Sequence, residues 1–96
     1  MINTTRIRSV IFGVVKDDDS NPVPNARVSF VVGPVPLPDI AALTDIKGNF
    51  TLSAPVAGEY VISVVSDNFI AKDVKIKVEL NEQKHVQMSL SRSKES

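Results

Sequence analysis

The residue spacing with the clearest chemical meaning in this sequence is Asp17-x-Asp19-x-Asn21, which places side-chain oxygens at alternate positions. Carboxylate and amide oxygens at this spacing open a calcium-binding loop. The rest of that loop is missing, because Pro22 stands where its glycine belongs and Val28 where its bidentate glutamate belongs. We therefore expect a solvated turn whose carboxylates accept backbone N–H groups, with a metal site as the alternative.

Residues that could catalyse a reaction are few. The chain of 96 residues contains no cysteine and one histidine, His85. His85 is out of phase with the apolar Val86 and Met88, so we expect it to point to solvent, without a second metal ligand or a nucleophile beside it. No serine stands in a Gly-x-Ser-x-Gly context, and serine hydrolysis needs a base held against the hydroxyl. We therefore expect no catalytic residues, no enzyme activity and no cofactor.

Charge and composition argue against several classes of partner. Eleven basic residues balance eleven acidic ones, so no long-range field gathers nucleic acid or an anionic membrane surface. The longest apolar run, residues 10–15, is far shorter than the roughly 20 residues of a membrane-spanning helix. We expect neither nucleic acid binding nor membrane insertion. The N-terminus lacks the features of a signal peptide, which predicts a chain that is cytoplasmic as synthesised, with export as part of an assembly left open.

The elements that would position any site are strands. Apolar runs rich in Val and Ile, separated by Pro, Gly, Asn and Asp, predict an all-β sandwich, and no segment sustains a helical period. Residues 1–8 form the predicted flexible N-terminal segment, 9–91 the single domain and 92–96 the disordered tail. The seven predicted strands are 9–16, 26–32, 41–44, 49–54, 59–66, 70–78 and 84–91.

Alternation along these strands identifies the inward face, because successive side chains point to opposite sides. Phe12 and Phe69 fall outside the inward sets, yet we expect the core for both, since large apolar side chains are mostly buried. Few aromatic side chains then remain at the surface, which argues against a sugar-binding platform. The expected inward residues are Ile11, Val15, Val28, Phe30, Val32, Phe50, Leu52, Tyr60, Ile62, Val64, Val74, Ile76, Val78, Val86, Met88 and Leu90.

Two loops have distinctive sequences. Asp45 and Gly48 suit a bulged hairpin loop, so we expect the strands 41–44 and 49–54 to pair antiparallel. Segment 33–40 has prolines at every second position, which cannot donate to a sheet ladder and predict a stiff extended arm. Its apolar side chains either form an exposed interaction surface or fold back over an open edge or end of the sandwich. The candidate partner-binding residues on this arm are Pro34, Val35, Pro36, Leu37, Pro38 and Ile40.

The spacing of the turn residues resembles that of a known family. The pattern runs Ile11-x-Gly13-x-Val15, Thr44-Asp45-x-x-Gly48-x-Phe50-x-Leu52, Pro55-x-x-Gly58-x-Tyr60 and Val86-x-Met88-x-Leu90. In these residues the sequence resembles the carboxypeptidase regulatory-like domain family, whose fold is similar to that of transthyretin and prealbumin. The resemblance implies a seven-stranded Greek-key sandwich without an active site of its own, which usually accompanies a larger protein.

These observations predict a non-enzymatic structural or docking module that binds a larger protein partner. The resemblance is consistent with an accessory of a bacterial surface or secretion-spike assembly. The alternative is a carbohydrate-binding or small-ligand-binding sandwich module. An open edge strand could also pair with a copy of itself to form a homodimer.

Overall fold

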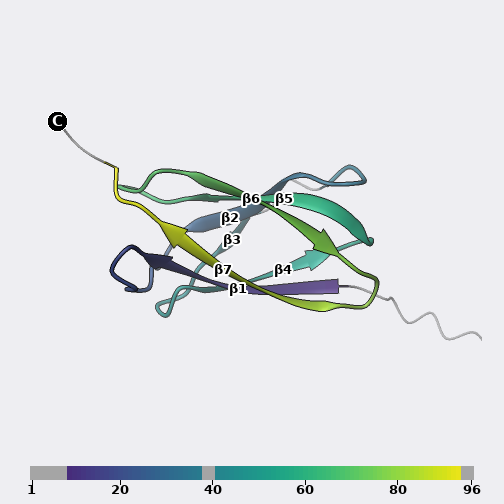
Figure 1. The fold of residues 1–96 in the computed structure, drawn as a ribbon, viewed down its shortest axis with the longest axis horizontal. Coiled ribbons are helices and arrows are strands. Elements are labelled where there is room, and N and C mark those ends of the chain that lie inside the picture. The colour runs from purple at the N-terminus through teal and green to yellow at the C-terminus, as the bar shows by residue number, and fades with distance from the viewer. Residues whose placement is uncertain (1–8, 38–40, 94–96) are drawn as a thin grey trace, which may run out of the picture.

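The structure is a computed structural model that describes residues 9–37 and 41–93 (Figure 1). None of these described residues forms a helix of the length and apolarity needed to cross a membrane. The predicted flexible segment 1–8 lies outside the described residues. The strands are β1 (Ser9–Asp17), β2 (Arg27–Val32), β3 (Ala41–Leu43), β4 (Asn49–Ala54), β5 (Gly58–Val65), β6 (Lys72–Val78) and β7 (Gln83–Leu90).

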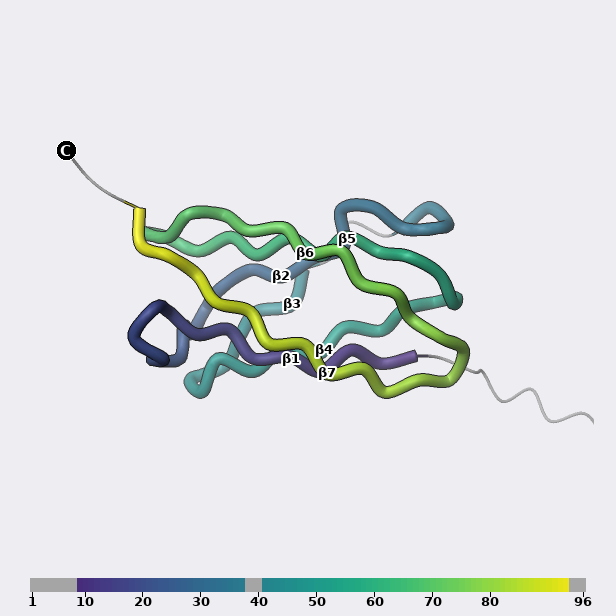
Figure 2. Tube along the Cα trace, viewed as in Figure 1, coloured from purple at the N-terminus to yellow at the C-terminus, as the bar shows by residue number. Residues whose placement is uncertain are grey.

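The strands form two sheets that pack face to face, and together they make the predicted all-β Greek-key sandwich (Figure 2). One sheet has the order β4-β1-β7, and the other has the order β3-β2-β5-β6. The central strand β1 pairs antiparallel with β4 and parallel with β7. Each predicted strand is present, with ends within two residues of the prediction.

The antiparallel pairing predicted between β3 and β4 is wrong, because the two strands belong to different sheets. The expected turn does form: Asp45 Oδ1 accepts the backbone N–H groups of Lys47 and Asn49, and Gly48 has a φ of 80°. Thr44, however, ends β3 by donating its backbone N–H to the Ala26 carbonyl, whereas Asn49 onward pairs with β1. Turn residues specify where a chain reverses, but tertiary contacts decide which strand it then joins.

The core lies between the two sheets and contains most of the residues that alternation predicts. Phe30, Val74 and Val86 are half-buried and pack against it. The prediction for Val32 is wrong, because this side chain is 57% exposed. The pairing of β2 with β5 is irregular between Phe30 and Val32, and an extra residue at such a bulge reverses the alternation beyond it. The predicted residues that are buried are Ile11, Val15, Val28, Phe50, Leu52, Tyr60, Ile62, Val64, Ile76, Val78, Met88 and Leu90.

Candidate functional site

The proline-rich arm leaves the end of β2 and returns onto the sandwich, at the right-hand end of Figure 1. Leu37 is half-buried and packs against the core. Gly33 allows this close approach, because a Cβ atom there would lie 2.7 Å from Leu37 Cδ1 and 3.1 Å from the Tyr60 ring. Of the two arrangements considered for the arm, its described part therefore follows the one that folds back.

A second contact fixes the start of the arm to the first residue of β5, next to the loop between β4 and β5. Pro34 packs over Gly58, where a Cβ atom would lie 2.8 Å from Pro34 Cγ. The fully buried Tyr60 anchors the same loop, since its hydroxyl donates to the Val56 carbonyl at 2.6 Å and accepts from the Val56 N–H at 3.3 Å. The arm is thus held against a rigid part of the sandwich.

Exposed valines surround this contact. Val31, Val32 and Val35 are 53%, 57% and 37% exposed, and the irregular pairing near Val31 accounts for the exposure of two successive valines. Val56, on the anchored loop, is also exposed. No charged residue occurs between residues 28 and 37, and a hollow of about 550 Å³ runs along residues 30–37. We call Val31, Val32, Pro34, Val35, Pro36 and Val56 the arm patch.

The described candidate residues of the arm therefore differ in exposure. Pro34, Val35 and Pro36 are exposed and belong to the arm patch, while Leu37 supports the arm from beneath. Pro38 and Ile40 lie outside the described residues. Binding of a partner by these side chains remains a prediction.

The candidate metal residues lie at the opposite end of the molecule, in the loop after β1. Asp17 is buried, and its Oδ1 atom accepts the N–H groups of Asp19 and Asn21, both at 2.9 Å. Asp19 and Asn21 themselves are exposed. Within residues 9–37 and 41–93, no group of three His, Cys, Asp or Glu side chains is arranged to hold a metal ion. The structure places the three residues in one turn, and a metal site there remains only the alternative to a simple capped turn.

The loop before β4 repeats this arrangement. Asp45 accepts from Lys47 and Asn49 as Asp17 accepts from Asp19 and Asn21. In each loop the fourth residue has a positive φ, 67° at Ser20 and 80° at Gly48. Both aspartates therefore act as caps of a five-residue turn.

These caps lower the pKa of both side chains in the same way. The N–H of Asn21 is the main cause that lowers the pKa of Asp17 below its ordinary value of 3.8, while desolvation opposes the change. The N–H of Asn49 lowers the pKa of Asp45 for the same reason, again against desolvation. In each case a carboxylate accepts hydrogen bonds that favour its charged form.

We expect the two caps to make folding stability sensitive to acid. A carboxylate with a lowered folded-state pKa stabilises the fold above the unfolded-state pKa of about 3.9, and this contribution is lost as the pH falls through the folded-state pKa. Asp17→Asn and Asp45→Asn should each lower the melting temperature at pH 7 but have little effect near pH 2. Thermal melts between these pH values test this, and a difference from wild type that is independent of pH would contradict it.

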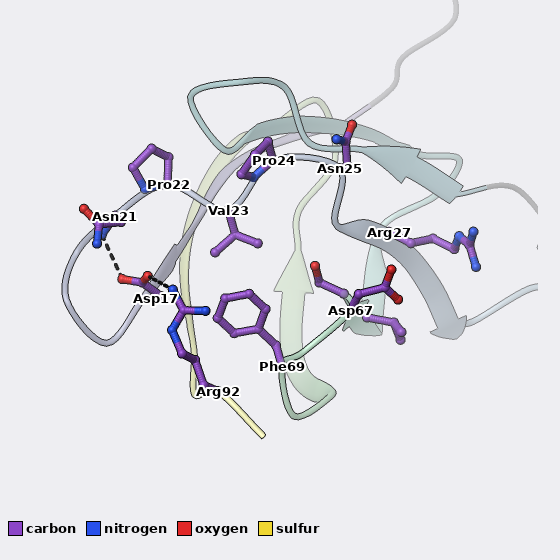
Figure 3. A pocket seen from close by; sticks show the side chains of 12 residues that line it. Asp17, Asn21, Pro22, Val23, Pro24, Asn25, Arg27, Asp67, Phe69 and Arg92 are labelled. Carbon is purple, nitrogen blue, oxygen red and sulfur yellow. Dashed lines mark hydrogen bonds and ion pairs between the residues drawn. The ribbon is translucent and has the colours of Figure 1, made fainter. Parts of the chain in front are cut away.

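A hollow of about 450 Å³ lies beside the Asp17 turn (Figure 3). The Arg92 guanidinium lies 4.9 Å from the centre of the Phe69 ring, and Arg92 Nη2 donates to Asp17 Oδ2 at 3.3 Å. Figure 3 shows Arg92 between these two partners. Phe69 is half-buried and packs against the core, as expected.

Sequence reasoning missed Arg92 because it assigned residues 92–96 to a disordered tail. The structure describes residues 92 and 93, and the Ser93 N–H donates to the Asn68 carbonyl. Residues 94–96 lie outside the described part of the chain. Arg92 continues the alternation of Met88 and Leu90, so the period of two was the available signal that it turns toward the inner side.

The outer face of the β4-β1-β7 sheet carries a pair of stacked rings. His85 is exposed, as predicted. The expectation that Phe12 lies in the core is wrong, because Phe12 is only partly buried, lies outside the core cluster and stacks its ring on His85, with 5.5 Å between centroids and 24° between planes. The neighbouring Ile11 is buried, and alternation then places Phe12 on the opposite face.

Comparisons with known proteins agree on the fold. A family model described as the carboxypeptidase regulatory-like domain matches residues 10–91. Among curated proteins, none matches the sequence.

Similar solved structures include proteins of different kinds. A chain of a type II cohesin–X-dockerin interface-mutant complex from Acetivibrio cellulolyticus is 16% identical, with a TM-score of 0.67 over 88% of this chain and 58% of that chain. A streptococcal ancillary pilin is 12% identical, with a TM-score of 0.68 over 94% and 34% of the two chains. Hydroxyquinol 1,2-dioxygenase from Pseudomonas putida is 8% identical, with a TM-score of 0.70 over 94% and 58%. This chain thus spans less than two thirds of each, and at these identities the likeness shows the fold alone.

Proposed function

The chain belongs to the carboxypeptidase regulatory-like domain family, and from this membership we propose that it is a non-catalytic docking module that binds a larger protein through the arm patch. The observation that carries the proposal is the exposure of Val31, Val32 and Val35 on a supported, uncharged segment. Contiguous apolar side chains at a surface mark interaction sites, and a rigid backbone loses little entropy on binding.

The supports of the arm match what docking requires. Pro34 rests on Gly58, and Leu37 packs beside the Tyr60 ring, so the intervening Val35 is held in place from both sides. A partner with an apolar pocket rimmed by polar groups would bury Val35 at the centre of the interface. Such central apolar anchors contribute most of the binding energy in protein interfaces.

The residue inventory supports a role without catalysis. The sequence has no cysteine, and its one histidine stacks on an aromatic ring rather than on a nucleophile. Asp17 and Asp45, whose pKa values are lowered, accept backbone N–H groups in turns. A perturbed pKa in such a cap is accounted for by the fold itself.

We place the module in an assembly, as an accessory of a bacterial surface or secretion-spike structure. The sandwich is similar in fold to a chain of a cohesin–X-dockerin complex and to a streptococcal ancillary pilin. This likeness supports the class of function at the level of the fold.

Charge placed in the arm patch should abolish docking. We expect the double variant Val31→Lys/Val35→Lys to weaken binding to the partner at least about 100-fold, because two ammonium groups would be desolvated at the centre of an apolar interface. The control is Ile46→Lys/Ile70→Lys, at side chains that are 80% and 56% exposed elsewhere on the surface. The measurement is the affinity for each product of the neighbouring genes, co-purified and then titrated.

Melting temperatures of both double variants should match that of the wild type, so that a lost affinity reports contact and not unfolding. Docking through the arm patch is refuted if Val31→Lys/Val35→Lys binds as tightly as wild type. It is also refuted if the control variant loses as much affinity as the arm variant.

A further inference from the structure

Among the described residues, the outer side of the β4-β1-β7 sheet carries no carboxylate and, apart from Lys16, no ammonium group. Strand β1 runs along its middle, because it pairs with β4 on one side and β7 on the other. Lys16 stands at the border, near the end of β1. We call this surface the neutral face, and its residues are Val10, Phe12 and Val14 on β1, Asn49, Thr51 and Ser53 on β4, and Gln83, His85 and Gln87 on β7.

The strand register arranges these residues in three rows. Phe12 lies between Thr51 and His85, and the flanking rows place Val10 and Val14 between hydroxyl or amide side chains in the same way. Apolar groups thus form a central line with hydrogen-bonding groups on both sides.

The outer side of the other sheet differs in composition from the neutral face. On that side, exposed side chains of both charge signs occupy the outward positions of the strands, which alternate with the inward ones. The charged residues there are Arg27, Glu59, Asp73, Lys75 and Lys77. The contrast within one small molecule indicates that the neutral face suits an uncharged ligand, since none of the residues that define this face offers a carboxylate or ammonium group to a charged one.

The two rings give the neutral face a fixed apolar centre. The near-parallel stack of Phe12 on His85 restrains both rings, and Phe12 is only partly buried. A shallow hollow of about 630 Å³ surrounds them, lined also by Asn49, Thr51 and Gln87. This volume falls within the range of roughly 300–1,000 Å³ that is typical of small-ligand sites.

We propose that the neutral face binds a neutral glycan. The C–H face of a sugar ring can pack on Phe12, and its hydroxyls can exchange hydrogen bonds with the Thr51 hydroxyl and the Gln87 amide, which both donate and accept. An extended peptide lying over Phe12 would gain no strand pairing, because both edges of β1 are already used and only the outer edges of β4 and β7 can accept another strand. This proposal is independent of docking through the arm patch.

Titrations followed by NMR of the backbone amides test the proposal. The probes are hexasaccharides of glucose, mannose and N-acetylglucosamine, with a sulfated heparin hexasaccharide as the anionic comparison. We expect at least one neutral hexasaccharide to bind with a dissociation constant of about 1 mM or below. The shifted amides should lie in β1, β4 and β7, and the anionic probe should bind more weakly.

Variants assign the binding to Phe12. Phe12→Ala should weaken it about tenfold, Phe12→Tyr should retain it, and Lys75→Ala on the opposite face should have no effect. Gln87→Ala provides a second variant should Phe12→Ala fold poorly. The proposal fails if no neutral probe binds at about 10 mM, if Phe12→Ala and Gln87→Ala both bind as wild type, or if the shifts lie elsewhere. A Phe12-dependent dimer in light scattering would instead assign the neutral face to a second copy of the chain.

Discussion

Replacing Gly13 by alanine is expected to lower the free energy of unfolding by about 3 kcal/mol. Gly13 lies directly opposite Phe50 in the pairing of β1 with β4. The buried Phe50 ring occupies the space beside Gly13, where an added Cβ atom would lie 2.1 Å from Cζ and 2.2 Å from Cε1. One of the two groups must therefore move.

The magnitudes decide the direction of this effect. Alanine restricts the unfolded chain more than glycine and would stabilise by about 0.4–1 kcal/mol at a position with room for it. Displacing a buried phenylalanine sacrifices part of the roughly 3–5 kcal/mol that its full removal costs. The loss exceeds the gain, so Gly13→Ala should destabilise the protein.

A double-mutant cycle isolates the contact between Gly13 and Phe50. In a Phe50→Leu background, which frees space beside β1, Gly13→Ala should cost less than half of what it costs in the wild type. Urea unfolding of the four proteins provides the free energies. Equal costs in both backgrounds would show that ring displacement is not the cause.

The second large effect is expected at Thr44, which is 2% exposed. Its Oγ1 donates to the Val23 carbonyl at 2.6 Å and accepts from the Ala26 N–H at 2.8 Å. Thr44→Val keeps the shape but leaves both backbone groups without this partner. Since each unsatisfied buried group costs roughly 1–3 kcal/mol, we expect a loss of about 3 kcal/mol.

Thr44→Ser is the matched control, because it keeps the hydroxyl and removes one methyl group. It should cost about 1 kcal/mol. Urea unfolding again gives the measurement, with unchanged m-values expected. A Thr44→Val protein that is no less stable than Thr44→Ser would contradict the role of the hydroxyl.

Much of the fold could be predicted because strands of a sandwich have one buried face. The alternation of Ile76 and Val78 with lysines, and of Met88 and Leu90 with polar residues, identifies that face without a structure. The predictions were wrong where a feature other than the alternation within a strand determined the structure. The bulge near Val31 shifted Val32 outward, and the hydrogen bonds of Thr44 kept β3 in a different sheet from β4.

The candidate site could be predicted in part. Proline spacing located the arm, but only the structure shows that Leu37 packs down while Val35 remains exposed. Phe12 was assigned to the core by residue type, although its position next to the inward Ile11 already indicated the outer face. For Phe12, the position in the alternation of the strand was more informative than the general tendency of phenylalanine to be buried.

The most direct test of docking through the arm patch is site-specific photo-cross-linking. A photoreactive residue replaces Val35 in one variant and Ile46 in the other, each co-expressed with the products of the neighbouring genes. Docking predicts one adduct of defined mass from position 35, lost when Val31→Lys is added, and none from position 46. Equal adducts from both positions, or none from position 35, would contradict it.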